Sequence, residues 1–233
     1  MSSVQHHYIQ NNRKEFGVHM DKGLRKLYDA FKDYHDLVQQ NGQAATIKDL
    51  AQNGQKPDYY FISCCDSRYD PSHLPHVGPG HHFKSEHIAA LVPPHDQPEA
   101  LSVGAAIEYA VTVLHVKYII IMGHTQCGGV KELVESQDAE HNTELEHLSQ
   151  WMNTAKGALS SMSQETLKKG GCSETCDLAE QHTILWSLKN LKNYPVVRRA
   201  MERGELSIHG WRYDIEHSIV ECWDPTENAF VTY

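Results

Sequence analysis

The stretch that decides the fold is VKYIIIMGHTQCGGVKELVES, residues 116–136. It begins with an apolar run that contains three consecutive isoleucines, and β-branched runs of this kind favour a strand buried on both faces. A helix is expected from Gly128 onward. His124 and Cys127 therefore lie where a strand gives way to a helix.

A second cluster of reactive side chains follows another expected strand upstream. The run DYYFISC, residues 58–64, is short and apolar, and CDSR comes directly after it. In open parallel sheets, ligands gather outside the carboxyl ends of neighbouring strands. We therefore expect Cys64 and Asp66 to meet His124 and Cys127 at one end of the sheet, although the two clusters are far apart in the chain.

The remaining segments complete an α/β pattern, in which strands and helices alternate. This predicts a central, mostly parallel β-sheet flanked by helices, with an N-terminal helical arm and a strand-rich C-terminal tail. We expect a single domain over residues 1–233, with the arm in 1–55 and the α/β core with its C-terminal extension in 56–233. The further elements expected are strands in 87–92, 206–215 and 218–223, and helices in 99–115, 143–168, 176–193 and from Pro195 to Gly204.

The arm carries apolar side chains at helical spacing, three to four residues apart. Asn41-Gly42 then provides a helix stop. A helical arm ahead of the first strand often packs on a partner, so this stripe is a candidate contact surface. Its members are Leu24, Leu27, Tyr28, Phe31, Tyr34 and Leu37.

Composition excludes several classes of function. The 233 residues include 21 basic and 30 acidic side chains, a formal charge of −9, so we expect no nucleic-acid partner. No segment approaches the roughly 18–20 apolar residues that span a bilayer, so we expect no membrane association. The first residues lack an apolar signal segment, and we expect a cytoplasmic protein with reduced thiols.

The six cysteines have no regular spacing, which favours metal binding or burial over disulfides. Cys65 points away from its neighbour Cys64 in an extended chain, and we expect it to pack in the core. Cys172 and Cys176 share one face if their segment is helical. A buried pair is expected there rather than a second metal site.

Thiolate and imidazole are the ligands that zinc prefers, and a carboxylate can complete a tetrahedron. The donor set of Cys64, Asp66, His124 and Cys127 therefore predicts a zinc site. Cys127 would face a helix N-terminus, which favours its thiolate. The residues alone leave two alternatives open, a purely structural zinc and no metal at all.

The motifs CCDSR, residues 64–68, and GHTQCGG, residues 123–129, resemble the paired Cys-x-Asp-x-Arg and His-x-x-Cys signature of the β-class carbonic anhydrases. The likeness covers about residues 20–232. It continues, in the same order and spacing, through IAALVPP, AAIEYAVTVLHVKYIIIMGH and NYPVVRRAMERGELSIHGWRYDI.

This resemblance implies one zinc ion (Zn2+) per chain, held by Cys64, His124 and Cys127, with the fourth position shared between water and Asp66. The implied activity is the reversible hydration of carbon dioxide to bicarbonate and a proton by zinc-bound hydroxide. Because two thiolates make zinc a weaker acid than three imidazoles would, the active form is expected under alkaline conditions.

The resemblance also implies a gate and an assembly. Arg68 pairs with Asp66 and keeps that carboxylate off the metal, while an unpaired Asp66 blocks the site. Phe83 and Gly128 are implied to line the substrate pocket. The N-terminal helices are implied to embrace a second subunit in a homodimer or homotetramer, with residues 83–92 of one chain lining the pocket of the other.

The sequence departs from the family's usual pattern at His81, Glu86, His87 and Ala90. Glu86 stands where an arginine is usual, and that arginine helps to hold bicarbonate in a non-catalytic pocket beside an aromatic residue like Tyr213. A glutamate would repel the anion. We therefore expect weak or absent regulation by bicarbonate.

Two alternative functions stay open. The departures near residues 81–90 allow a zinc hydrolase of a related small electrophile, carbonyl sulfide (COS) or carbon disulfide (CS2). In the second alternative, the chain is a non-catalytic zinc-binding homologue that acts as a scaffold. The presence of both Asp66 and Arg68 argues against a scaffold, because a structural zinc needs neither residue.

Overall fold

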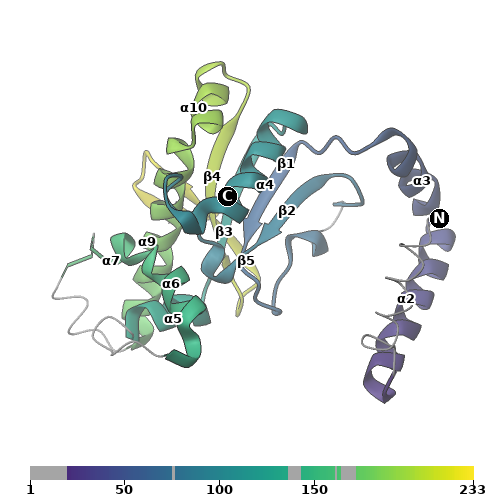
Figure 1. Cartoon of the computed structure of the whole chain (residues 1–233), viewed down its shortest axis with the longest axis horizontal. Coiled ribbons are helices and arrows are strands. Elements are labelled where there is room, and N and C mark those ends of the chain that lie inside the picture. The colour runs from purple at the N-terminus through teal and green to yellow at the C-terminus, as the bar shows by residue number, and fades with distance from the viewer. Residues whose placement is uncertain (1–19, 75–76, 136–142, 161, 164–171) are drawn as a thin grey trace, which may run out of the picture. The chain divides into compact units, whose positions relative to one another are not determined.

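The computed structural model describes residues 20–74, 77–135, 143–160, 162–163 and 172–233. The chain divides into two compact units, Met1–Gln52 and Asn53–Tyr233. A six-stranded sheet lies at the centre of the second unit, in the order β2-β1-β3-β4-β5-β6 (Figure 1). The strands are β1 (Tyr59–Ser63), β2 (His82–Glu86), β3 (Tyr118–His124), β4 (Ser207–Asp214), β5 (Ile219–Asp224) and β6 (Ala229–Val231).

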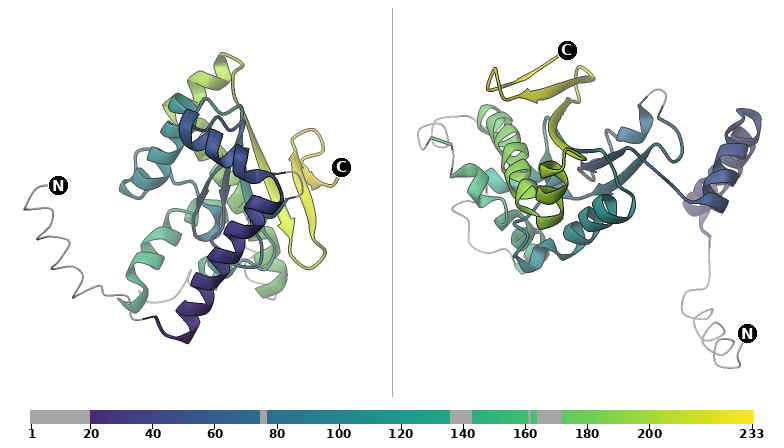
Figure 2. Two further views of the ribbon diagram at one scale, coloured as in Figure 1. Left: turned by 90° about the vertical axis from the view of Figure 1, so that its right-hand side faces the viewer. Right: turned by 90° about the horizontal axis from the view of Figure 1, so that it is seen from above.

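Strands β2, β1, β3 and β4 run parallel, and β5 and β6 follow as antiparallel strands. Figure 2 shows the hairpin of the last two strands in yellow near the C-terminus. The mostly parallel sheet and the strand-rich tail confirm the predicted fold class. Because β1 and β3 are parallel neighbours, their carboxyl ends lie side by side.

Helices connect the strands of the second unit, and two further described helices, α2 and α3, belong to the N-terminal unit. None of the described helices is both long and apolar enough to cross a membrane. The helices are α2 (Lys22–Gln40), α3 (Gln43–Asn53), α4 (Leu101–Glu108), α5 (Gly128–Glu135), α6 (Glu146–Asn153), α7 (Lys156–Leu159), α9 (Cys172–Asn193) and α10 (Pro195–Glu202).

The parallel part of the sheet is buried on both faces, as the apolar sequence of β3 predicts. Ile119 and Ile121 join one apolar cluster, which includes Ile107 of α4. Ile120 and Met122 point to the opposite face and join a second cluster with helices α5 and α6. This alternation is the two-residue period of a strand.

The predicted strand in residues 87–92 is wrong. The strand is β2, which lies just before it, and Ile88–Ala90 forms a 3₁₀ turn with Ala89 at φ 60°. Val92 shows why an apolar run can be buried without being a strand. Its N–H donates to Ser187 Oγ at 3.1 Å, and its carbonyl accepts from Asn190 Nδ2 at 2.9 Å, so side chains of α9 replace the bonds of a strand ladder.

The other expected elements agree closely with the structure. The helix predicted in 99–115 is α4 followed by a π-helical turn at Tyr109–Val113. Helix α10 and strands β4 and β5 occupy their predicted segments. Helices α6 and α7 lie within 143–168, of which 161 and 164–168 lie outside the described residues.

In the N-terminal unit, α2 begins where the Asp21 side chain accepts the N–H of Leu24 at 2.9 Å, an N-cap. It ends at Gln40, with Asn41 as the C-cap and Gly42 next at φ 77°, where the sequence predicts a helix stop. Val38 is its buried residue. The six apolar side chains of the predicted stripe are all exposed, from 46% for Tyr28 to 67% for Phe31.

Candidate metal centre

Three side chains with metal-binding atoms meet at the carboxyl ends of β1 and β3. Cys64 directly follows β1, His124 is the last residue of β3, and Cys127 directly precedes α5. One donor atom from each of the three lies within 4.8 Å of the other two, and all three residues are buried. The two strand ends therefore converge as expected, and the group could hold a metal ion.

The backbone around this group has the shape that the convergence requires. Gln126 has φ 57°, which turns the chain between His124 and Cys127. The carbonyl of Cys127 then accepts the N–H of Lys131 at 2.9 Å, which begins α5. On the other side, the N–H of Ala89 donates to Cys64 Sγ at 3.3 Å, so the 3₁₀ turn contacts the first sulfur.

The imidazole of His124 is held in the orientation that a metal ligand needs. Its Nδ1 lies 2.8 Å from the backbone oxygen of Thr125, so Nδ1–H donates there and Nε2 keeps its lone pair. Nε2 is buried and has no hydrogen-bond partner among the described residues. A lone nitrogen beside two sulfurs is a donor set that fits zinc.

The two thiols cannot both ionise in the bare protein. A hydrogen bond from Cys127 lowers the pKa of Cys64 below the usual range of a thiol, although burial opposes this shift. The pKa of Cys127 is raised, first by that same hydrogen bond to the Cys64 thiolate and then by burial. A divalent cation would relieve this conflict, because it stabilises both thiolates at once.

Asp66 faces the same group but is held by Arg68. Arg68 Nε donates to Asp66 Oδ1 at 2.9 Å and its terminal nitrogen to Oδ2 at 2.8 Å, a two-bond fork. The hydrogen bond from Arg68 lowers the pKa of Asp66 to about 2. The carboxylate oxygen Oδ2 lies 3.9 Å from His124 Nε2, which places Asp66 beside the centre.

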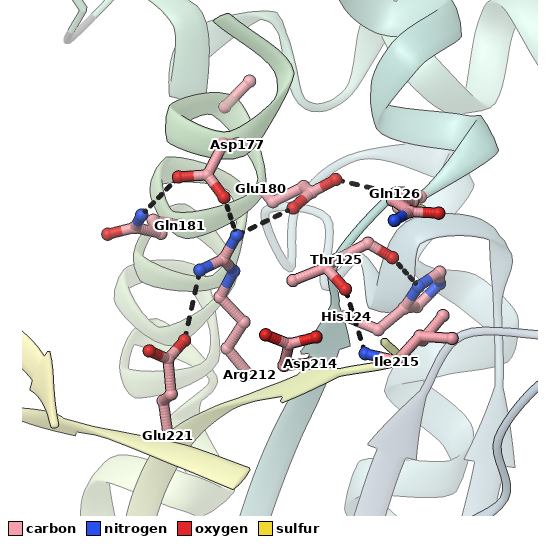
Figure 3. A network of polar contacts seen from close by, with 12 residues as sticks. His124, Thr125, Gln126, Asp177, Glu180, Gln181, Arg212, Asp214, Ile215 and Glu221 are labelled. Carbon is pink, nitrogen blue, oxygen red and sulfur yellow. Dashed lines mark hydrogen bonds and ion pairs between the residues drawn. The ribbon is translucent and has the colours of Figure 1, made fainter. Parts of the chain in front are cut away.

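An ionic network centred on two buried residues, Glu180 and Arg212, supports the centre through the backbone of Cys127 (Figure 3). Glu180 of α9 is 3% exposed, and its Oε1 accepts the backbone N–H of Cys127 at 3.0 Å. Arg212 of β4 donates to Glu180 Oε2 at 3.2 Å, to Glu221 Oε2 at 3.1 Å and to Asp177. Sequence reasoning missed this network, because an acidic residue in a long helix is usually solvated.

Comparison with known proteins agrees with this geometry. The family model described as carbonic anhydrase matches residues 59–220, a range that contains all three donor residues and Asp66. The chain is 33% identical over 179 residues to β carbonic anhydrase 3 of Arabidopsis thaliana, which covers 77% of this chain and 69% of that protein.

The chain belongs to the β-carbonic anhydrase family. It is also 30% identical over 211 residues to a carbonic anhydrase of Synechocystis, which covers 90% of this chain and 72% of that protein. Hydration of carbon dioxide is the function of this family, so the resemblance noted from the motifs is confirmed.

Solved structures agree with the assignment. The β-carbonic anhydrase CcaA superposes with a TM-score of 0.79 at 27% identity, covering 91% of this chain and all of that one. A tetrameric β-carbonic anhydrase from Sordaria macrospora gives a TM-score of 0.64 at 28% identity, covering 82% of this chain and 96% of that one. Both are similar in fold to this β-carbonic anhydrase.

The other residues predicted to line the pocket or to affect regulation lie in the core, at a helix start and on the surface. Phe83 of β2 packs with Tyr60, 5.2 Å between ring centroids, in the first apolar cluster. Gly128 is the first residue of α5, with open space where a Cβ would lie. Glu86 pairs with Lys84 at 3.0 Å on the surface.

The prediction that Cys65 packs in the core is wrong, because Cys65 is exposed. Strand β1 ends at Ser63, so the alternation used for that prediction stops one residue before Cys64. Cys176 is buried as expected, whereas the side chain of Cys172 lies outside the described residues.

Proposed function

We propose that this β-carbonic anhydrase holds one zinc ion per chain with Cys64, His124 and Cys127, and interconverts carbon dioxide and bicarbonate. The observation that carries the proposal is the buried sulfur, nitrogen and sulfur group within 4.8 Å, at which Asp66 is directed. When bound, zinc acts as a Lewis acid and lowers the pKa of water from 15.7 to about 7.

Asp66 and Arg68 have distinct parts in this proposal. The two hydrogen bonds from Arg68 keep Asp66 ionised and hold its carboxylate in place. Asp66 then accepts a hydrogen bond from the attacking water and orients it, rather than closing the metal site. Arg68 also donates to the backbone oxygen of Gln126 at 2.9 Å, which fixes the fork relative to the turn that carries Cys127.

We also propose that the active protein is a homodimer or homotetramer. The exposed apolar stripe of α2 supports this, because a row of six large apolar side chains is unfavourable in water. The Sordaria relatives are tetrameric. A cytoplasmic location is part of the same proposal, and the five cysteines whose side chains are described are free thiols, as a reducing compartment would keep them.

Weak regulation by bicarbonate also belongs to the proposal. Glu86 already has a cationic partner in Lys84, which in turn contacts Asp70 at 3.2 Å. Two carboxylates share this one ammonium group, so the surface around Glu86 does not offer a free cation to an anion. A bicarbonate soak that places the anion against Glu86 and Tyr213 would contradict this part.

The experiment measures zinc content and gas exchange in wild-type protein purified without chelator. We expect about one zinc per chain and carbon dioxide hydration at alkaline pH. Cys64→Ser should lose both, whereas the matched control Cys65→Ser should keep both, because that neighbouring thiol is exposed. Sulfide release from COS or CS2 without carbon dioxide exchange would instead identify a hydrolase. Bound zinc without either activity would identify a scaffold.

A further inference from the structure

Tyr69 lies one residue after the CDSR motif and is nine-tenths buried against the metal centre. Its hydroxyl accepts the backbone N–H of Cys64 at 2.9 Å and donates to the carbonyl of Met122 at 2.7 Å. One phenol thus joins the end of β1 to β3 by two hydrogen bonds, two residues before His124.

These two hydrogen bonds lie where the ladder of hydrogen bonds between β1 and β3 ends. The parallel pairing of β1 with β3 runs as far as Ser63 opposite Met122. Beyond that pair, the N–H of Cys64 would need the carbonyl of a neighbouring strand, and the hydroxyl of Tyr69 takes that position instead. The phenol bridges the two strand ends where they carry the first sulfur and the imidazole.

The ring of Tyr69 contacts the second donor as well. Its centroid lies 4.9 Å from that of the His124 imidazole, and it also stacks on Tyr213, with 5.4 Å between centroids and 22° between the ring planes. The imidazole therefore has a packed aromatic wall on one side and the Thr125 carbonyl at Nδ1. Both contacts restrict rotation of the His124 imidazole.

We propose that Tyr69 is a positioning residue for the metal centre, which sets the separation of Cys64 from His124 through its hydroxyl and the plane of His124 through its ring. This rests on the proposed zinc ligands. Residues that orient ligands in this way typically affect metal affinity or activity by about 10- to 100-fold when they are changed.

Tyr69→Phe tests the hydroxyl, because it keeps the ring and removes both hydrogen bonds. The matched control is Tyr60→Phe on strand β1, whose buried hydroxyl hydrogen-bonds with Ser85 Oγ at 2.8 Å and touches none of the three donors. Each variant is titrated with zinc against a chelator, and its cobalt-substituted form is compared by the absorption of the thiolate–cobalt centre.

We expect Tyr69→Phe to bind zinc about 10- to 100-fold more weakly and to change the cobalt spectrum, whereas Tyr60→Phe keeps the wild-type affinity and spectrum. Wild-type affinity and an identical cobalt spectrum in Tyr69→Phe would overturn the inference and leave the proposed function intact. Failure of the wild-type protein to bind zinc would overturn the proposed function itself.

Amide hydrogen exchange of the wild-type protein provides a second test, which stands even if Tyr69→Phe does not fold. The inference expects the Cys64 amide of the zinc-free protein to be protected as strongly as the amides of the β1–β3 ladder. Exchange of that amide at the rate of an exposed loop would overturn it.

Discussion

The carboxylate of Glu180 accepts the backbone N–H of Cys127 at 3.0 Å, so a buried anion lies directly behind a proposed zinc ligand. Burial raises the pKa of Glu180, whereas the Cys127 N–H and Arg212 favour its ionised form. A buried charge of this kind is tolerated only when it is paired. Arg212 supplies the pairing, since its side chain is 8% exposed and contacts the second carboxylate oxygen.

Replacing Arg212 with methionine should therefore destabilise the protein by about 3–5 kcal/mol, because it leaves the buried carboxylate of Glu180 without its cation. The double variant Arg212→Met with Glu180→Gln should recover part of this loss. Urea unfolding measures both. Arg203→Met is the control, since its partner Glu205 is exposed and the stability should change little. Equal effects of the two arginine changes would contradict the role given to Arg212.

Asp66→Ala should retain about one zinc per chain and lower carbon dioxide turnover by about 100-fold or more, as expected when a group that orients the attacking water is lost. The three donor atoms lie within 4.8 Å without any contribution from Asp66, so the metal should remain. Zinc analysis and stopped-flow exchange on the same sample measure the two effects. Parallel loss of metal and turnover would show that Asp66 is needed to hold the ion.

Gly129→Ala should destabilise the protein by about 1–3 kcal/mol through overpacking. A Cβ there would lie 2.6 Å from Ile88 Cγ2 and 3.3 Å from Ala89 Cβ, which pushes against the turn whose N–H contacts Cys64 Sγ. Gly128→Ala is the matched control, with nothing within 4 Å of the added atom. Thermal unfolding should separate the two variants, and an unchanged midpoint for Gly129→Ala would refute the steric argument.

Phe31→Glu should shift the protein from oligomer to monomer, because it places a charge in the middle of the exposed stripe of α2. Phe31 is the most exposed of the six apolar side chains, at 67%. Gln39→Glu adds the same charge to the same helix at an exposed polar position and should leave the assembly unchanged. Light scattering during size-exclusion chromatography measures the mass. A wild-type monomer would refute the assembly proposal outright.

Much of the fold was predictable because its signals are local. Three isoleucines mark β3, and the apolar run before Cys64 marks β1. The convergence of Cys64 with His124 then follows from a general rule of parallel sheets rather than from any contact. These parts depend on pattern and topology, which a single sequence contains.

The remaining parts depend on partners that are distant in the chain. Val92 was misassigned to a strand because its backbone bonds go to Ser187 and Asn190, which only the packed structure brings near. Glu180 resembles a solvated helix residue until Arg212, on another element, neutralises it. Such pairings leave no periodic signal in the sequence.

The stability of the protein should fall as the pH rises above about 10. Tyr194 is 4% exposed and its hydroxyl donates to the carbonyl of Pro93 at 2.9 Å. Burial raises the pKa of Tyr194 to about 12, whereas an unfolded tyrosine titrates near 10. Between these values the unfolded state loses its proton first, so the free energy of unfolding decreases by about 1.4 kcal/mol per pH unit for this residue.

Urea unfolding from pH 8 to 11 measures this slope. Tyr194→Phe should be less stable near neutral pH, by about 1 kcal/mol for the lost hydrogen bond, but should lose less stability as the pH rises. The two curves should therefore approach each other above pH 10. Parallel curves would show that the buried hydroxyl of Tyr194 does not govern the alkaline limb, and that other groups titrate there instead.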